Sequence, residues 1–286
     1  MRIKSGSRSK MDEYDHAVSG AILHSSHDAS ESDYIFEQLA RGPDTGKAPV
    51  DYIDLRKYAK PSRHQRKRGT CAAFAAASIR EIQEHISRGE SQSHSPEFIY
   101  YHRANKPSEG MFGRDVLMIM RDIGSVTEEM YPYNESLEPL TRPSTEHYAL
   151  AAESRIANFA RVTTCGGLKR AIREVGPCYL VLPLYATRPH FWRRSRNDKD
   201  EPSGHSVAVV GYDNSGFILK NSWGPTWNGD GCITFAYSEW DHVKECWAPI
   251  NHRIKTIKDE PDLKMSTISL NSSDDSVKTK SKCDLM

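Results

Sequence analysis

The hydrophobic and polar positions of this chain change character about halfway along it. Residues 71–87 (CAAFAAASIREIQEHIS) combine alanine with strong helix formers, with Thr70 before them as an N-cap and Gly89 after them. This pattern predicts a helix that begins at Cys71. Shorter apolar periodicities predict further helices over residues 96–104, 114–123, 146–158 and 168–174.

The following part of the chain has the pattern of short strands. Four segments rich in β-branched and aromatic residues are separated by Gly, Asn, Asp and Pro turns, and they cover residues 178–185, 206–213, 216–223 and 232–240. They predict an antiparallel sheet. The pattern itself therefore establishes an order, helices first and strands afterwards.

Both ends of the chain lack this patterning. Residues 1–49 are rich in Ser, Asp and Gly, and the turn-forming stretch ARGPDTGKAP precedes Val50. We interpret residues 1–49 as a lead segment, and a short pro-segment is one interpretation of it. Residues 253–286 mix charges with Ser and Thr and contain no aromatic residue, which predicts a disordered tail. The folded domain is expected to span residues 50–252.

Length and charge narrow the class of protein. A chain of 286 residues is long enough for one large domain or two closely packed lobes. With 39 Lys+Arg against 38 Asp+Glu, the formal charge of +1 argues against a nucleic acid partner or a charged membrane surface. Neither an apolar run of about 18 residues nor a secretory signal is visible, so we expect a cytoplasmic chain without a transmembrane segment.

The six cysteines are scattered and form no CxxC pair and no zinc-type spacing with histidine. They are Cys71, Cys165, Cys178, Cys232, Cys246 and Cys283. We expect reduced thiols, with no metal and no cofactor.

Cys71 is the first candidate for chemistry. A thiol reacts as its thiolate, and the positive end of a helix dipole lowers the pKa of a cysteine at the helix start. Taken alone, a cysteine in an alanine-rich helix is more often a buried structural thiol. A nucleophile also needs a base, a group that orients the base, and donors for the oxyanion.

Other segments supply those groups. Gln65 stands six residues before the cysteine, and Gly69 would let the chain turn closely there. His205 lies at the start of an apolar strand in GHSVAVVGYD, and Asn221 opens NSWG directly after the strand GFILK. Trp223 in the same turn is suited to shield a histidine–asparagine hydrogen bond from water.

Three blocks, GTCAAFA with Gln65 ahead of it, GHSVAVVGYD and KNSWGPTWNGDG, resemble the signatures of the papain family of cysteine peptidases. His205 and Asn221 follow Cys71 by 205 − 71 = 134 and 221 − 71 = 150 residues, within the roughly 130 to 150 typical of that family. The resemblance covers roughly residues 51–250. In style it is closest to short, signal-less members from bacteria and large DNA viruses, so a viral source, with location in the host cytoplasm or virion, stays open.

The resemblance implies a papain-like α+β fold with a helical left lobe, an antiparallel right lobe and a cleft between them. It implies a monomeric thiol protease acting on polypeptides, an endopeptidase rather than an exopeptidase. It also implies roles for five residues: Cys71 as nucleophile, His205 as base and then acid, Asn221 as its orienting group, Gln65 in the oxyanion hole, and Trp223 as the shield. The alternative is a catalytically silent scaffold that binds a protein partner, against which the intact residue set argues.

Some positions depart from the family pattern. Arg68 and Ala72 stand where the family often has a second cysteine and a tryptophan, so the usual disulfide cannot form there. The basic run over residues 56–68 is expected to be a solvated loop, with an electropositive rim of the site as the alternative. Residues 191–193 (Phe-Trp-Arg) are expected on a surface loop beside the cleft.

The terminal CDLM has the form of a prenylation box on Cys283, with Lys278, Lys280 and Lys282 upstream. Asp284 weakens the match, and a chance occurrence in a disordered tail is the alternative. Prenylation would give weak membrane association.

Overall fold

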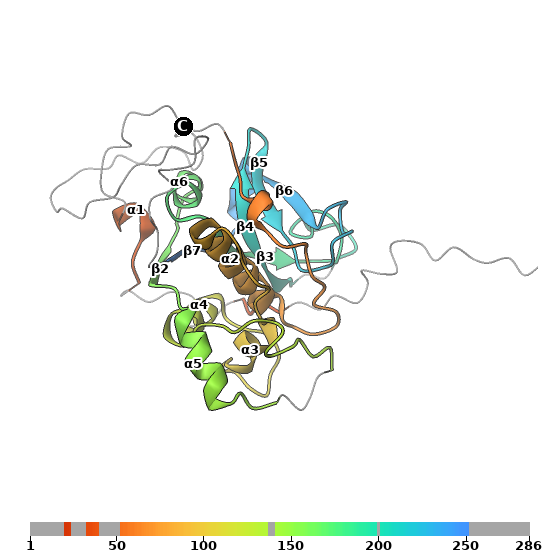
Figure 1. Cartoon of the computed structure of the whole chain (residues 1–286). Helices are drawn as coiled ribbons and strands as arrows, with labels where there is room; N and C mark the ends of the chain where they lie inside the picture. Colours follow the sequence, from red (N-terminus) through yellow and green to blue (C-terminus); the bar gives the residue numbers. More distant parts are fainter. Residues whose placement is uncertain (1–19, 24–32, 40–51, 137–140, 199–200, 252–286) are drawn as a thin grey trace, which may run out of the picture.

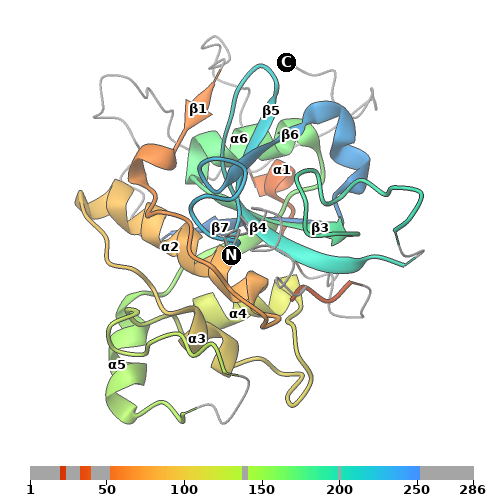
Figure 2. The ribbon, with the colours of Figure 1, turned by 90° about the vertical axis from the view of Figure 1, so that its right-hand side faces the viewer.

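The structure is a computed structural model that describes residues 20–23, 33–39, 52–136, 141–198 and 201–251. Helix α2 (Cys71–Arg88) runs through the middle of the molecule. Helices α3, α4 and α5 lie on one side of it and strands β3 to β6 on the other (Figures 1 and 2). The predicted tail and its Cys283 lie outside the described residues.

Helix α2 forms as the sequence predicts and ends one residue later. Gly89 ends it in the left-handed conformation with φ of 83°, which a glycine adopts without the strain that a Cβ would add. Thr70 occupies the N-cap position, but its hydroxyl makes no capping bond. It lies 2.9 Å from the Tyr133 hydroxyl instead. Residues 71–84 of the helix are all buried, which places Cys71 at a fixed point of the interior.

The helical side contains α3 (Pro96–Tyr101), α4 (Gly113–Asp122) and α5 (Thr145–Glu153). The helix predicted over residues 146–158 is too long. The chain leaves the helix at Ser154 and enters β2 (Asn158–Arg161), which pairs with β7 (Glu245–Ile250). Pairing with a distant strand therefore overrides the local helical pattern.

The sheet is antiparallel throughout, in the order β2-β7-β3-β4-β5-β6, and the short β1 (Ile53–Asp54) pairs with β4. Its central strands are β3 (Cys178–Leu184), β4 (Ser203–Tyr212) and β5 (Gly216–Lys220). β6 (Cys232–Ala236) is shorter than predicted, because the chain continues as a 3-10 helix, η2 (Tyr237–His242). A second 3-10 helix, η1 (Arg56–Tyr58), follows β1. Helix α6 (Cys165–Val175) packs against the sheet. β2 and β7 were not predicted.

The described part of the lead segment packs on this body. Helix α1 (Phe36–Leu39) lies against α6, where Glu37 Oε1 accepts hydrogen bonds from the N–H groups of Thr163 and Thr164, both at 2.9 Å. Asp33 makes an ion pair of 2.8 Å with Arg114 of α4. These contacts fix residues 33–39 against the folded domain.

The basic run is not simply a solvated loop. Arg68 is 1% exposed and its guanidinium donates to Glu97 Oε1 of α3 at 3.1 Å. Arg63 pairs with Glu81 at 2.9 Å and with Glu128 at 3.0 Å. Buried carboxylates draw these two side chains inward, so the solvated-loop prediction is wrong for both. Arg68 thereby ties the segment before Cys71 to α3.

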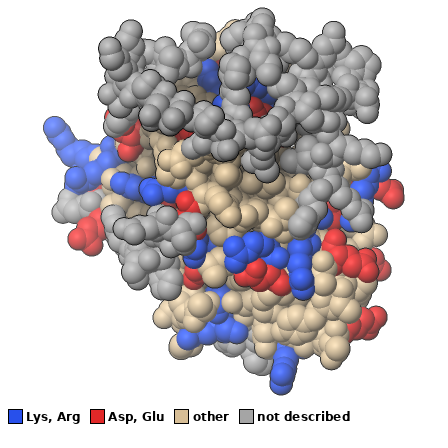
Figure 3. Space-filling model, turned by 90° about the vertical axis from the view of Figure 1, so that its left-hand side faces the viewer, with Lys and Arg blue, Asp and Glu red and all other residues tan. Residues whose placement is uncertain are grey.

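Charges are mixed on the surface. In the lower half of Figure 3, Lys and Arg side chains lie next to Asp and Glu side chains. No helix in the described part of the chain is long and apolar enough to cross a membrane.

Candidate active site

Cys71 opens α2 and is fully buried. The backbone N–H of Ser206 donates to its Sγ at 3.4 Å, which puts the thiol beside β4. Burial raises the pKa of Cys71 to about 11, opposed by hydrogen bonds from the backbone of Ser206, Gly20 and Ala72. The thiol is therefore neutral in this arrangement.

His205 lies in β4 and is also fully buried. Its Nε2 is 2.7 Å from Oδ1 of Asn221, the first residue after β5, and β4 and β5 are adjacent antiparallel strands. Since the asparagine oxygen can only accept, the proton belongs on Nε2. Nδ1 is buried and has no hydrogen-bond partner among the described residues. Burial lowers the pKa of His205 to about 4, with the Asn221 bond opposing the shift.

Aromatic rings enclose this histidine. Trp223 lies with its ring centre 4.6 Å from the imidazole, and Phe191 meets the imidazole edge-on at 5.0 Å. Phe191 and Trp192 are fully buried, so the surface-loop prediction is wrong for both, whereas Arg193 is exposed and pairs with Glu239. Phe191 packs against Trp223 and Trp192 packs against Phe235, with ring centres 5.3 and 5.1 Å apart, and these contacts account for the burial. The sequence feature that could have predicted this burial is the pair of adjacent aromatic residues in an otherwise charged segment.

Gln65 is brought to the same region by the turn that carries Asn221. Its backbone N–H donates to Ser222 O at 2.9 Å, and Ser222 Oγ donates to its Oε1 at 2.6 Å. Its Nε2 donates to Arg68 O at 3.0 Å. Gln65 thus shares hydrogen bonds with the residue next to Asn221, and its role in an oxyanion hole stays a prediction.

Residues 20–22 of the lead segment lie across the site. Gly20 O accepts from Met111 N–H at 2.9 Å, Ile22 N–H donates to Met111 O at 3.0 Å, and Ala21 N–H donates to Gly204 O at 3.2 Å. The segment is therefore hydrogen-bonded to the helical side and to β4 at once. The chain passes so closely that a Cβ added to Gly20 would lie 2.3 Å from the carbonyl carbon of Gly69. Gly69, which was predicted to permit a close turn before Cys71, is thus the residue against which Gly20 packs.

No motif in the sequence indicates this arrangement, since the contacts run through the main chain. Within the described ranges, no group of three or more His, Cys, Asp or Glu side chains could hold a metal ion. The five described cysteines are free thiols, and all are buried.

Comparison with known proteins identifies relatives. Residues 49–250 match the family described as "Papain family cysteine protease". The chain is 29% identical to cathepsin K of Mus musculus over 203 residues, 67% of this chain and 60% of that protein. It is 25% identical to cathepsin L2 of Homo sapiens, covering 66% of this chain and 61% of the relative. The chain thus spans about three fifths of the length of these curated relatives.

Solved structures match the fold. Xylellain, a cysteine protease from Xylella fastidiosa, superimposes with a TM-score of 0.69 at 22% identity, covering 84% of this chain and 98% of the other. Digestive procathepsin L2 from Tenebrio molitor gives a TM-score of 0.64 at 19% identity, covering 85% and 80%. The predicted papain-like α+β fold is confirmed.

Proposed function

Because this chain belongs to the papain family of cysteine proteases, we propose that it is a thiol protease that hydrolyses polypeptides with Cys71 as nucleophile. One observation carries the proposal. The 2.7 Å contact between His205 Nε2 and Asn221 Oδ1 leaves Nδ1 without a partner, on a strand whose next residue donates to the Cys71 thiol. A cysteine nucleophile needs such a base, oriented by a third group and with a free nitrogen, and this supports the proposal.

The proposed reaction has two steps. The Cys71 thiol gives its proton to His205 Nδ1, and the thiolate adds to the peptide carbonyl. His205 returns this proton to the leaving amine as the C–N bond breaks, which leaves a thioester. Water then attacks the thioester, His205 takes a proton from the water, and the thiol is regenerated with release of the acid. Gln65 and the Cys71 backbone N–H are the proposed donors to the oxyanion.

We also propose that the lead segment is a short pro-segment that keeps the enzyme latent. Residues 20–22 hydrogen-bond to both sides of the site, and Cys71 and His205 are fully buried while they do so. A polypeptide substrate needs access to the thiol, so this segment must leave before hydrolysis.

Hydrolysis of a fluorogenic peptide library in reducing buffer tests both proposals. The wild type, Cys71→Ala and Gly20→Val would be compared, with end-blocked peptides included because we propose an endopeptidase. We expect little activity from the wild type, activity from Gly20→Val, and none when Cys71→Ala is added to it. If Gly20→Val exposes the thiol to alkylation but cleaves nothing, the chain is a silent scaffold instead. Equal activity of the wild type and Gly20→Val would contradict the latency proposal and leave the peptidase proposal intact.

Monomeric state, cytoplasmic location and prenylation of Cys283 are further proposals. The resemblance to the papain family supports the first, the composition of the chain the second, and the CDLM motif the third. Size-exclusion chromatography with light scattering checks the first, and fractionation of the producing cells checks the second. The intact mass of the chain from a eukaryotic host, with and without Cys283→Ser, checks the third.

A further inference from the structure

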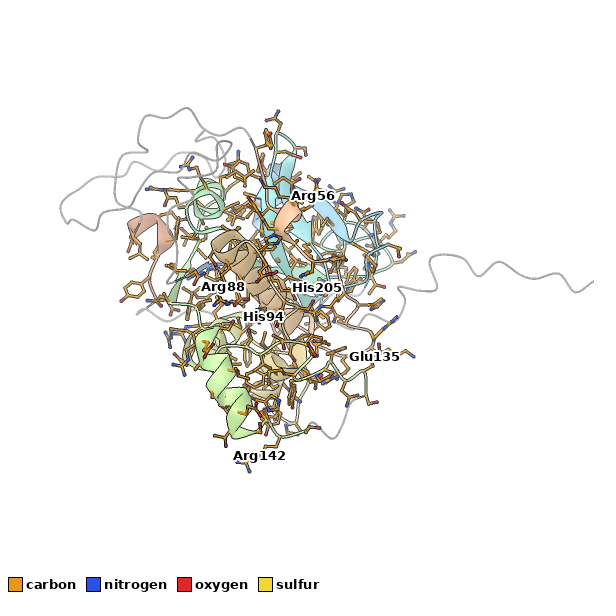
Figure 4. The ribbon with its side chains drawn as sticks, in the orientation of Figure 1. Arg56, Arg88, His94, Glu135, Arg142 and His205 are labelled. Carbon is orange, nitrogen blue, oxygen red and sulfur yellow. The ribbon has the colours of Figure 1, made fainter. Side chains whose placement is uncertain are left out.

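A groove of about 630 Å³ lies between the C-terminal half of α2 and helix α5. We call it the α2–α5 groove; its lining includes Glu84, Arg88, Glu90, Glu129, Leu150 and Glu153. Glu84 is 13 residues beyond Cys71 on the same helix, which corresponds to about 20 Å along the helix axis. The groove is therefore separate from the candidate active site. Figure 4 labels Arg88 and His94 of the groove, and His205 of that site.

The floor of the groove has its own hydrogen bonds. His94 Nε2 is 2.9 Å from Glu84 Oε2, and the other nitrogen of His94 is 2.7 Å from Ser125 Oγ. Ser154 Oγ donates to Glu84 Oε1 at 3.0 Å. Because these buried groups satisfy one another, the floor does not require a ligand.

The rim differs from the floor. Glu90, Glu129 and Glu153 are exposed, and none of them makes an ion pair with any described residue. Arg88, the cation of the described lining, lies 3.6 Å from Glu84. Met130 and Leu150 of the same lining are 36% and 37% exposed. A groove with unpaired carboxylates and exposed apolar side chains fits a segment that carries both basic and apolar residues.

This chain contains such a segment directly after its last described residue, Asn251. Residues 252–258 (HRIKTIK) hold three basic residues and two isoleucines: Arg253, Lys255 and Lys258 with Ile254 and Ile257. None of residues 252–258 is acidic, so the charge is complementary to the rim throughout the segment.

The described chain also ends in the right place. Pro249 O accepts from Gln83 Nε2 at 2.8 Å, and Ile250 O accepts from Ala157 N–H at 2.7 Å. Gln83 precedes the lining residue Glu84 on α2, but its side chain faces a separate small cavity that it lines together with Pro249. Ala157 comes three residues after the lining residue Ser154. The described chain thus ends at the face of α2 next to the groove face. Seven residues beyond Asn251 span up to about 25 Å when extended. That reach is sufficient to cross a groove of this volume.

We propose that residues 252–258 dock in the α2–α5 groove of their own chain. The basic side chains pair with Glu90, Glu129 and Glu153, and the isoleucines cover Met130 and Leu150. Since β7 belongs to the sheet and α5 to the helical side, the docked segment ties the two sides together. The inference is independent of any peptidase activity.

Hydrogen exchange of the full chain, read by mass spectrometry, tests this docking. The amides of residues 253–258 should exchange about tenfold more slowly than those of residues 270–280, and about 0.5 M salt should reduce the difference. Glu129→Lys with Glu153→Lys should remove the protection. Adding Lys255→Glu and Lys258→Glu to that pair should restore it. The control pair Glu109→Lys with Glu201→Lys makes the same charge change at exposed sites outside the groove and should have no effect.

Equal exchange of both stretches in the wild type would overturn the proposal, as would protection that survives the groove double variant. The occupant's origin is tested by zero-length carbodiimide cross-linking of a mixture of light and heavy-isotope chains. Cross-links from Lys255 or Lys258 to Glu129 or Glu153 within one isotope support docking in the same chain. Mixed-isotope cross-links would replace that conclusion with exchange between two copies.

Discussion

Replacing Gly20 with Val should open the candidate active site. The side chain of valine has no room where Gly20 packs, because its Cβ would lie 2.3 Å from both the carbon and the oxygen of the Gly69 carbonyl and 2.7 Å from Thr70 N. These neighbours are backbone atoms that lead directly into α2, so they cannot move aside without displacing Cys71. The lead segment, which is held at this point by main-chain contacts, should move instead.

The size of the effect follows from the bonds that are lost. Residues 20–22 make three main-chain hydrogen bonds across the site, at 2.9, 3.0 and 3.2 Å. At a net 0.5 to 1.5 kcal/mol each, their loss costs the closed arrangement about 1.5 to 4.5 kcal/mol. Because about 1.4 kcal/mol corresponds to a tenfold change in an equilibrium, the population of the open form should rise about 10- to 1,000-fold.

Alkylation of Cys71 by iodoacetamide measures this population, with peptide mapping to separate Cys71 from the other thiols. The rate at Cys71 should rise by the same factor in Gly20→Val, while the other four described cysteines, all buried, should keep their rates. Gln38→Ala, an exposed change in the same lead segment, is the matched control and should react like the wild type. An unchanged rate at Cys71 in a folded Gly20→Val protein would refute the role of this segment. A rise at all cysteines would indicate unfolding instead.

Three further changes have expected outcomes. Arg68→Met leaves the buried Glu97 carboxylate uncompensated and should lower the free energy of unfolding by about 3 to 5 kcal/mol in urea titrations; adding Glu97→Gln should recover much of this loss. In the Gly20→Val background, Asn221→Ala removes the bond that orients His205 and should lower kcat/KM about 10- to 100-fold; an unchanged value would dismiss that role. Burial depresses the pKa of His205 from an ordinary 6.5 to about 4, so wild-type stability should fall as pH drops from 6.5 toward 4; His205→Gln should flatten this decline.

The sequence predicted the elements whose local pattern agrees with their environment. Helix α2 and strands β3 and β5 are each bounded within a few residues, because periodicity, β-propensity and turn residues all favour the same structure. The end of α5 was not predicted. Residues 154–158 favour a helix locally, but strand β2 gains its partner β7 from almost a hundred residues further along the chain. A single sequence does not show that pairing.

The residues of the candidate site also fall into a group that the sequence predicts and a group that it does not. Cys71, His205 and Asn221 stand in distinctive blocks, so their proximity could be expected from the sequence. Residues 20–22 could not be found in this manner, because their contacts use backbone N–H and C=O groups that every residue except proline offers. The contacts require only that residue 20 has no side chain. Many tightly packed positions in proteins have the same requirement, so a glycine there does not reveal the site.

Closure of the site and its charge state depend on each other. With the lead segment in place, burial raises the pKa of Cys71 to about 11 and lowers that of His205 to about 4, so the neutral thiol and neutral imidazole are favoured. A transfer of the proton from Cys71 to His205 would create two charges where water is excluded, which opposes ionisation. Release of the segment, as proposed, should let water reach both groups, and both pKa values should then move back toward their ordinary ranges. By linkage, any condition that charges His205 must favour release of the segment, and any contact that holds the segment must suppress the thiolate. If the proposed latency holds, the main-chain bonds of residues 20–22 should therefore control both access to Cys71 and its reactivity.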